Sequence, residues 1–206
     1  MESDNNGVPL TAENVAIFMD AYLTSQLAGY NTQGAVVAVV KDGEILFSGG
    51  YGYQDRENRI KMDPAVSLTR PGSISKLFTW VSVMQLYEQG LLDLDADVNT
   101  YLSSFQIPGT YEEPITMKHI LSHTAGFEET ALGYLITFDP EGAETLEYAM
   151  ANYIPARVNP PGVVSSYSNY ATALAGLIIQ NLSGLSFNEY VAVSYTHLTL
   201  PTTSRV

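Results

Sequence analysis

Ser73 and Lys76 are the residues whose types and spacing point most directly to chemistry. They lie three apart at the start of an apolar run that predicts a mostly buried helix beginning near Ser73. Residues three apart share a helix face, so the Lys76 amine can reach the Ser73 hydroxyl. A serine hydroxyl becomes a strong nucleophile when a base takes its proton, and a lysine serves as that base only where its surroundings lower its pKa. The spacing also fits an N-cap serine beside a solvated lysine.

Two observations favour the catalytic interpretation of this pair. Of the four lysines in the chain, only Lys76 has a serine three residues earlier. Lys76 also lies within the most hydrophobic helical stretch, where a lysine that is merely solvated is less expected. The preceding Pro71-Gly72 suits a tight junction between a loop and a helix. Backbone N–H groups at such a helix start point outward, so that of Ser73 could stabilise a developing oxyanion.

A second group of candidate residues follows the turn Pro160-Pro161-Gly162. Tyr167 and Asn169 lie just before the apolar stretch 171–182, which predicts a buried helix. A phenol near a lysine ammonium group loses its proton more easily, and an asparagine amide both donates and accepts hydrogen bonds. The alternative is a tyrosine that packs the loop and an asparagine that caps the helix.

Together, Ser73-Ile-Ser-Lys76 and Tyr167-Ser168-Asn169 resemble the serine β-lactamase and penicillin-binding-protein superfamily. The closest branch holds class C β-lactamases, D-alanyl-D-alanine carboxypeptidases and related esterases. The resemblance runs from about residue 11 to 192 and implies an α/β fold of the α+β type. That fold has an antiparallel sheet flanked by helices plus a helical subdomain, with the active site in the cleft between them. Further matching stretches are 34–40, 84–95, 119–127 and 167–184.

The resemblance also implies roles for these residues in a serine hydrolase. Ser73 would attack a carbonyl and form an acyl-enzyme, and its backbone N–H would form half of the oxyanion hole. Lys76 and Tyr167 would share the proton transfers, with Tyr167 the favoured base, and Asn169 would orient the substrate or Lys76. The substrate would be a small molecule or peptide carrying an ester, amide or β-lactam, and no metal or organic cofactor is implied. A non-catalytic ligand-sensing or scaffold relative is the alternative.

His119 and His123 are candidate general bases by residue type alone. Their sequence, Met117-Lys-His-Ile-Leu-Ser-His123, instead predicts that they end a short helix and brace the loop that follows. A Ser-His-Asp triad through His123 is the mechanistic alternative. No Gly-x-Ser-x-Gly elbow is present to support it.

Residues 193–206 resemble a translated transposase-type sequencing adapter, so we expect them to be an artefact. Relatives carry a third motif, Lys-Thr-Gly or His/Trp-x-Gly, on a later strand that supplies the second oxyanion donor. No such triplet follows Asn169. We therefore expect residues 11–192 to be a partial hydrolase domain, incomplete at its C-terminus and inactive by itself. Residues 1–10 form a polar segment without a signal peptide, although the resemblance implies an extracytoplasmic protein.

Composition narrows the function classes further. With 206 residues and 46% hydrophobic residues, the chain is long enough for one domain with a real core. Its net charge of −13 argues against binding to nucleic acid or anionic membranes. Cysteine is absent, and no apolar stretch is long enough to span a membrane. The acidic stretch 93–97 lacks a calcium-loop pattern and is interpreted as a solvated surface.

The elements expected around these motifs are simple. Thr11 is the predicted N-cap of a helix to about Ala28, with Glu13 and Asp20 facing outward. Strands 34–41 and 44–50 are predicted to form a hairpin through Asp42-Gly43. The first strand is apolar on both faces, as in a strand between two helix layers, and its outer edge is expected to be unpaired. Later loops are expected at Gly109, Gly126, Asp139-Pro140 and Pro160-Pro161; inward-facing residues of the first helix are expected to be Val15, Phe18, Met19 and Leu23.

Overall fold

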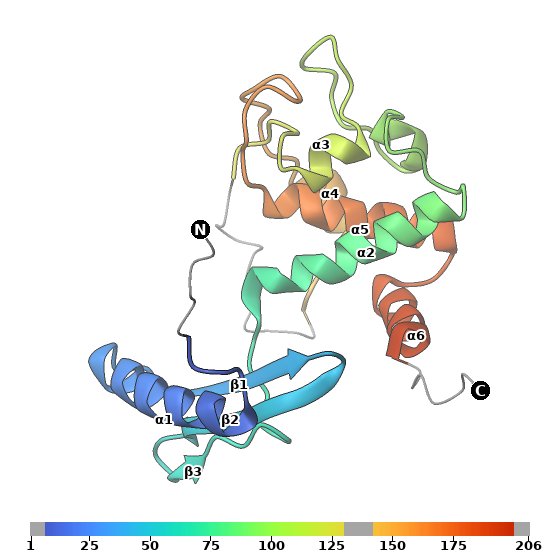
Figure 1. The fold of residues 1–206 in the computed structure, drawn as a ribbon. Helices are drawn as coiled ribbons and strands as arrows, with labels where there is room; N and C mark the ends of the chain where they lie inside the picture. The colour runs from blue at the N-terminus through green and yellow to red at the C-terminus, as the bar shows by residue number, and fades with distance from the viewer. Residues whose placement is uncertain (1–6, 130–141, 200–206) are drawn as a thin grey trace, which may run out of the picture. The chain divides into compact units, whose positions relative to one another are not determined.

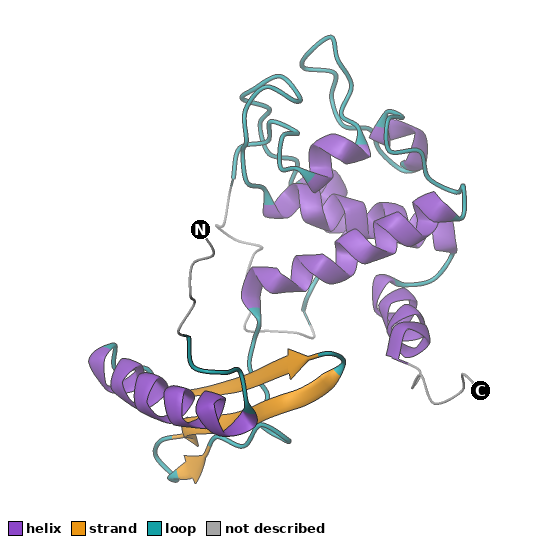
Figure 2. Ribbon diagram, in the orientation of Figure 1, coloured by secondary structure: helices purple, strands orange, loops and turns teal. Residues whose placement is uncertain are grey.

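The computed structural model describes residues 7–129 and 142–199, with side chains described to residue 194. The chain divides into two compact units, residues 1–70 and 71–206. The first unit holds a helix and a small sheet, and the second is helical (Figures 1 and 2). This combination confirms the predicted mixed fold with an antiparallel sheet. The loop predicted at Asp139-Pro140 lies outside the described residues.

Helix α1 (Ala12–Gly29) opens the first unit and begins where the sequence predicts. The Thr11 hydroxyl caps it by accepting a hydrogen bond from the Asn14 N–H at 3.2 Å. Val15 is buried, but Phe18, which was expected to face inward, is exposed. The Phe18 ring instead stacks on Tyr22, one turn along, with the ring centroids 5.4 Å apart. The apolar stripe of α1 is therefore wider than the surface that covers it.

Three antiparallel strands follow α1 in the order β1 (Gly34–Lys41), β2 (Glu44–Asp55) and β3 (Ile60–Lys61). Asp42 and Gly43 between the first two strands both have positive φ, as a two-residue hairpin turn requires. The hairpin is thus confirmed, although β2 continues five residues past the predicted end at Gly50.

Strand β1 is less buried than its apolar sequence predicts. All of its side chains are half-buried or exposed, and its one neighbour among the described strands is β2 (Figure 2). The expectation of a strand enclosed between helix layers is therefore not met within this unit, because α1 is the only described helix of the unit that packs on the sheet.

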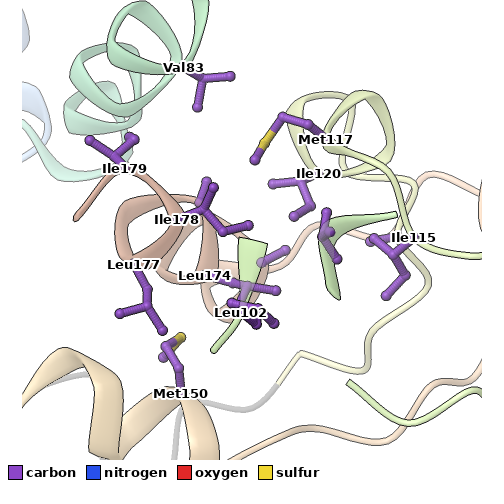
Figure 3. Packing of buried hydrophobic residues seen from close by; sticks show 14 of the residues in the cluster. Val83, Leu102, Ile115, Met117, Ile120, Met150, Leu174, Leu177, Ile178 and Ile179 are labelled. Carbon is purple, nitrogen blue, oxygen red and sulfur yellow. The ribbon is translucent and has the colours of Figure 1, made fainter. Parts of the chain in front are cut away.

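The second unit is organised around helix α5 (Asn169–Ser183). This helix is apolar on most of its surface, so it is buried by contacts with helices on several sides. Leu174, Ile178 and Ile179 lie at the centre of the hydrophobic core (Figure 3). The other helical elements are η1 (Gly72–Ser75), α2 (Lys76–Glu88), η2 (Val98–Tyr101), α3 (Met117–Leu121), α4 (Leu146–Asn152) and α6 (Phe187–Thr199).

Helix α2 contacts both α5 and α6, but only one of its faces is buried. Val83 and Leu86 lie in the core, whereas Leu77, Phe78 and Val81 are exposed. The sequence predicted a mostly buried helix, and that prediction is wrong for these exposed positions. The polar residues Thr79 and Ser82 lie on the buried face of α2, so the pattern of polar and apolar residues does not identify the covered side.

Two expectations about the chain as a whole concern these elements. None of the helices in the described part of the chain combines the length and hydropathy that crossing a membrane requires. Helix α6 continues through residue 193 to Thr199. The domain boundary at residues 192 and 193 stays a prediction.

Candidate active site

Ser73 is presented by a sharp turn at the entrance to α2. Gly72 has a φ of 57°, a left-handed conformation that glycine adopts without steric cost. Ser73 follows in the short 3₁₀ turn η1, and α2 begins at Lys76. The Ser73 side chain is exposed. Its N–H lies in the first turn, where backbone donors have no partner within the helix.

The structure brings all four predicted site residues together. Lys76 Nζ donates to Ser73 Oγ at 3.1 Å and to Asn169 Oδ1 at 2.6 Å. Ser73 Oγ and the Tyr167 hydroxyl share a hydrogen bond with 2.5 Å between the oxygens. Lys76 Nζ also lies 4.8 Å from the centre of the Tyr167 ring. The nucleophile candidate is therefore in contact with two groups that can exchange a proton with it.

The electrostatics of the cluster favour the ionised form of Tyr167. The pKa of its phenol lies below the ordinary value, chiefly because of its side-chain interaction with the Lys76 ammonium group and then because of its hydrogen bond with Ser73. Desolvation and the Glu129 charge act in the opposite direction. Since the Tyr167 side chain is 44% exposed, solvent also reaches this proton acceptor.

The start of α5 positions Tyr167 and Asn169. The Ser168 side chain caps the helix by accepting from the Ala171 N–H at 3.1 Å. One residue before Tyr167, the Ser166 N–H donates to the carbonyl of His123 at 2.6 Å, and its hydroxyl donates to a neighbouring backbone carbonyl. Tyr167 is thus held on both sides by backbone contacts, with its ring directed toward α2.

His123 acts as a brace in this structure, as the sequence predicts. Its Nδ1 accepts a hydrogen bond from the Ser168 N–H at 3.3 Å, and its ring lies 4.4 Å from that of Tyr167, centroid to centroid. Burial, followed by the Lys76 charge, lowers its pKa and favours the neutral ring. Among the described residues, no hydrogen bond joins His123 to Ser73. The geometry favours the Ser73–Lys76–Tyr167 arrangement over the triad alternative.

His119 was expected to end the short helix α3, but it lies near its start. Its Nδ1 accepts from the Thr116 N–H at 3.2 Å, so the ring caps the first turn. Burial and then the Arg157 charge lower the pKa of His119. The loop glycine Gly162 approaches this ring, and an added Cβ there would lie 3.3 Å from Nε2.

Sequence reasoning missed Glu129. Its Oε2 accepts from the Asn169 backbone N–H at 2.8 Å, and its Oε1 accepts from the Asn169 side-chain Nδ2 at 2.9 Å. In the sequence, Glu128-Glu129 has the same character as any exposed acidic pair. The only available signal was its place directly after the loop that carries His123.

The acidic stretch 93–97 has structural partners. Asp95 pairs with Lys118 at 2.7 Å, and Asp97 caps η2 by accepting from the Asn99 N–H. Within residues 7–129 and 142–199, no group of three or more histidine, cysteine or acidic side chains could hold a metal ion.

Comparison with known proteins identifies the family of this chain. The sequence model of the Beta-lactamase family matches residues 19–198. Ser73 and Lys76 have the spacing of the Ser-x-x-Lys motif of serine β-lactamases and penicillin-binding proteins. The chain belongs to the Beta-lactamase family.

Three similar proteins show the range of this family. Protein flp of Staphylococcus aureus (strain N315) is 28% identical over 184 residues, which cover 86% of this chain and 35% of that protein. A D-aminopeptidase of Gluconobacter oxydans (strain 621H) is 28% identical over 190 residues, or 85% of this chain and 33% of that one. The octameric penicillin-binding protein homologue from Pyrococcus abyssi has a TM-score of 0.74 and 27% identity, with 88% of this chain and 42% of that chain covered. The chain therefore spans about a third of the length of these curated relatives.

Proposed function

We propose that this chain carries the nucleophile-bearing part of a serine hydrolase that works through an acyl-enzyme. The contact of Ser73 Oγ with both Lys76 Nζ and the Tyr167 hydroxyl is the observation that carries this proposal. A hydroxyl held against a proton acceptor and a cation is the arrangement that activates a serine. Neither side chain would be placed there by packing, because Ser73 and Tyr167 are both exposed.

In the proposed reaction, ionised Tyr167 takes the proton of Ser73 as Oγ attacks the substrate carbonyl. A carbon–oxygen bond forms, and the carbonyl electron pair moves to the oxygen, where the Ser73 N–H stabilises it. Tyr167 then returns the proton to the leaving group as the bond to that group breaks. Water attacks the acyl-enzyme in a second step and gives its proton to Tyr167, which passes it to Ser73 Oγ. The Lys76 charge stabilises the phenolate throughout.

The chemistry of the site and the relatives support the substrate class that we propose. A D-aminopeptidase and a penicillin-binding protein homologue are among the similar proteins, which supports a peptide, ester, amide or β-lactam carbonyl. We propose that the second oxyanion donor is encoded beyond codon 192, as the adapter-like sequence of residues 193–206 suggests. On this proposal the fragment alone turns over little or no substrate.

Burst kinetics with a p-nitrophenyl ester test the proposal. The source DNA is resequenced across codon 192, and the protein that it encodes is expressed with Ser73→Ala and with the matched control Ser75→Ala. Ser75 is an exposed serine two residues along, whose hydroxyl makes no capping bond. We expect a burst of one nitrophenol per chain followed by turnover, lost in Ser73→Ala and kept in Ser75→Ala.

The other outcomes separate the remaining interpretations. A burst without later turnover would favour the ligand-sensing alternative, in which the acyl group is retained. Release that is equal in Ser73→Ala and the parent protein would show that Ser73 is not the nucleophile, and the proposal would fail.

A further inference from the structure

Glu129 contacts the site, but the proposed reaction assigns it no role. Its carboxylate lies at the N-terminus of α5, where its two oxygens accept from the Asn169 N–H at 2.8 Å and from Asn169 Nδ2 at 2.9 Å. Asn169 is the first residue of α5, so its N–H has no acceptor within the helix. A negative charge at this end of a helix is favourable. Both carboxylate oxygens of Glu129 therefore accept hydrogen bonds from the same residue, Asn169.

This contact determines which way the Asn169 amide faces. A carboxylate only accepts hydrogen bonds, and an ammonium group only donates them. With Nδ2 directed to Glu129, Oδ1 must face Lys76, and there it accepts from Nζ at 2.6 Å. If the amide were rotated by half a turn, its NH₂ group would face the ammonium and its oxygen would face the carboxylate. The hydrogen bonds thus run outward from Lys76, whose Nζ donates to Ser73 Oγ on one side and to Asn169 Oδ1 on the other, and Asn169 Nδ2 in turn donates to Glu129.

The two residues before Glu129 are held in place by backbone hydrogen bonds. Phe127 forms an antiparallel bridge with Arg157, and the Glu128 N–H donates to the carbonyl of Ala156 at 2.8 Å. Phe127 itself is fully buried. Glu129 therefore extends toward α5 from a fixed segment, although its own side chain is exposed.

We propose that Glu129 is a positioning residue that acts through Asn169 to hold the Lys76 ammonium group against Ser73 Oγ. This inference rests on the proposed function, because the geometry that it maintains is that of the proposed nucleophile. Glu129 has a second effect through its charge, which raises the pKa of Tyr167 and opposes the larger effect of Lys76.

Glu129→Gln tests the positioning role, with Glu128→Gln as the matched control. Both changes remove one exposed negative charge from adjacent residues, and only Glu129 has a side-chain contact with Asn169. A glutamine retains a single acceptor oxygen for two Asn169 donors. We expect the rate of Ser73 labelling by a fluorophosphonate to fall roughly tenfold in Glu129→Gln, as for a lost hydrogen bond to a charged group. In Glu128→Gln it should stay within about twofold of the parent, as for most surface changes.

A double-mutant cycle distinguishes positioning from general stabilisation of the helix. In an Asn169→Ala background the side-chain amide is gone, so Glu129→Gln should slow labelling no further. Loss of the Glu129 charge should also lower the pKa of Tyr167, which ¹³Cζ-tyrosine NMR measures as a titration midpoint at lower pH. Equal labelling in Glu129→Gln and Glu128→Gln, or the same loss in the Asn169→Ala background, would overturn the proposal.

The same samples separate failure of this inference from failure of the proposed function. If the protein that the resequenced DNA encodes is not labelled at Ser73, the proposed function fails. The side-chain amide resonance of Asn169 then decides the positioning role. A resonance shifted by Glu129→Gln but not by Glu128→Gln supports the contact, and a resonance unchanged by both overturns it.

Discussion

Ser73 and Tyr167 are polar, exposed and nevertheless in contact, and the charge of Lys76 lies beside both of them. An exposed phenol at ordinary pH keeps its proton, since its unperturbed pKa is about 10. Here the ammonium group of Lys76 and the hydroxyl of Ser73 both favour the phenolate. Burial lowers the pKa of His123 most, and the charge of the same ammonium group lowers it further. The Lys76 ammonium group thus favours the ionised form of Tyr167 and the neutral form of His123 in the same cluster.

Removal of the Lys76 charge should reverse the shift at Tyr167. In Lys76→Met we expect the pKa of Tyr167 to rise toward its ordinary value, because the largest cause of its depression is gone. The phenolate would then form only at higher pH. The increase in the rate of Ser73 labelling with pH would therefore occur at a higher pH than in the parent protein. Titration by ¹³Cζ-tyrosine NMR, with Tyr167→Phe to assign the signal, measures the shift. An unchanged or lower midpoint in Lys76→Met would contradict it.

At the scale of the elements, α5 connects the core to the site. Its middle residues, Leu174 and Ile178, are fully buried, while its first residue, Asn169, contacts Lys76. The position of the site therefore depends on the packing between α2 and α5. Exposed positions on the opposite face of α2, such as Leu77, contribute little to that packing.

A pair of substitutions tests this division of the helix surfaces. Ile178→Ala should lower the free energy of unfolding by about 2–5 kcal/mol, because it leaves a cavity in the core. Leu77→Ala, at a side chain that is 59% exposed, should change the free energy of unfolding by no more than about 0.5 kcal/mol. Urea unfolding of both variants measures the difference. A cost for Leu77→Ala as large as that for Ile178→Ala would mean that this face of α2 is covered.

The sequence predicted the elements better than their burial. The turn at Asp42-Gly43 and the cap at Thr11 are local signals, and both were confirmed. Which side of an apolar segment is covered depends on its partners in space, so the prediction for Phe18 was wrong and the cover expected for β1 is not met within its own unit.

In the site, too, local contacts were predicted better than contacts between residues far apart in the sequence. The spacing made Ser73 and Lys76 candidates, because the contact between them is local to one helical turn. Tyr167 and Asn169 were candidates from their place before an apolar stretch, but their roles beside Ser73 and Lys76 came from the resemblance to a known family. Glu129 was missed because its contact with Asn169 joins residues 40 apart in the sequence, and nothing in an exposed acidic pair indicates such a partner.

At the scale of the molecule, the two units differ in how much apolar surface they bury. Val15 is the one buried apolar side chain among the described residues of the first unit, while every residue of the main hydrophobic cluster belongs to the second. The first unit also presents β1 with one edge that no described strand covers. A small sheet with little core and an apolar edge is prone to pair with another copy.

We therefore predict that the chain self-associates through β1. Ala38→Lys places a charge at an exposed position in the middle of that edge strand, and it should shift the population toward smaller species. Thr24→Lys adds the same charge at an exposed position on α1 and should not. Sedimentation velocity at several concentrations measures the distribution. A monodisperse, cooperatively melting monomer of the parent chain would contradict the prediction.

The most direct test of the central claim is to locate a covalent adduct after incubation with a fluorophosphonate. The protein that the resequenced DNA encodes is labelled, with Ser73→Ala and Ser75→Ala beside it, and peptide mass spectrometry identifies the modified side chain. We predict one adduct per chain on Ser73, absent from Ser73→Ala and retained in Ser75→Ala. An adduct on another residue, or labelling that persists in Ser73→Ala, would show that the Ser73–Lys76–Tyr167 cluster does not activate the nucleophile.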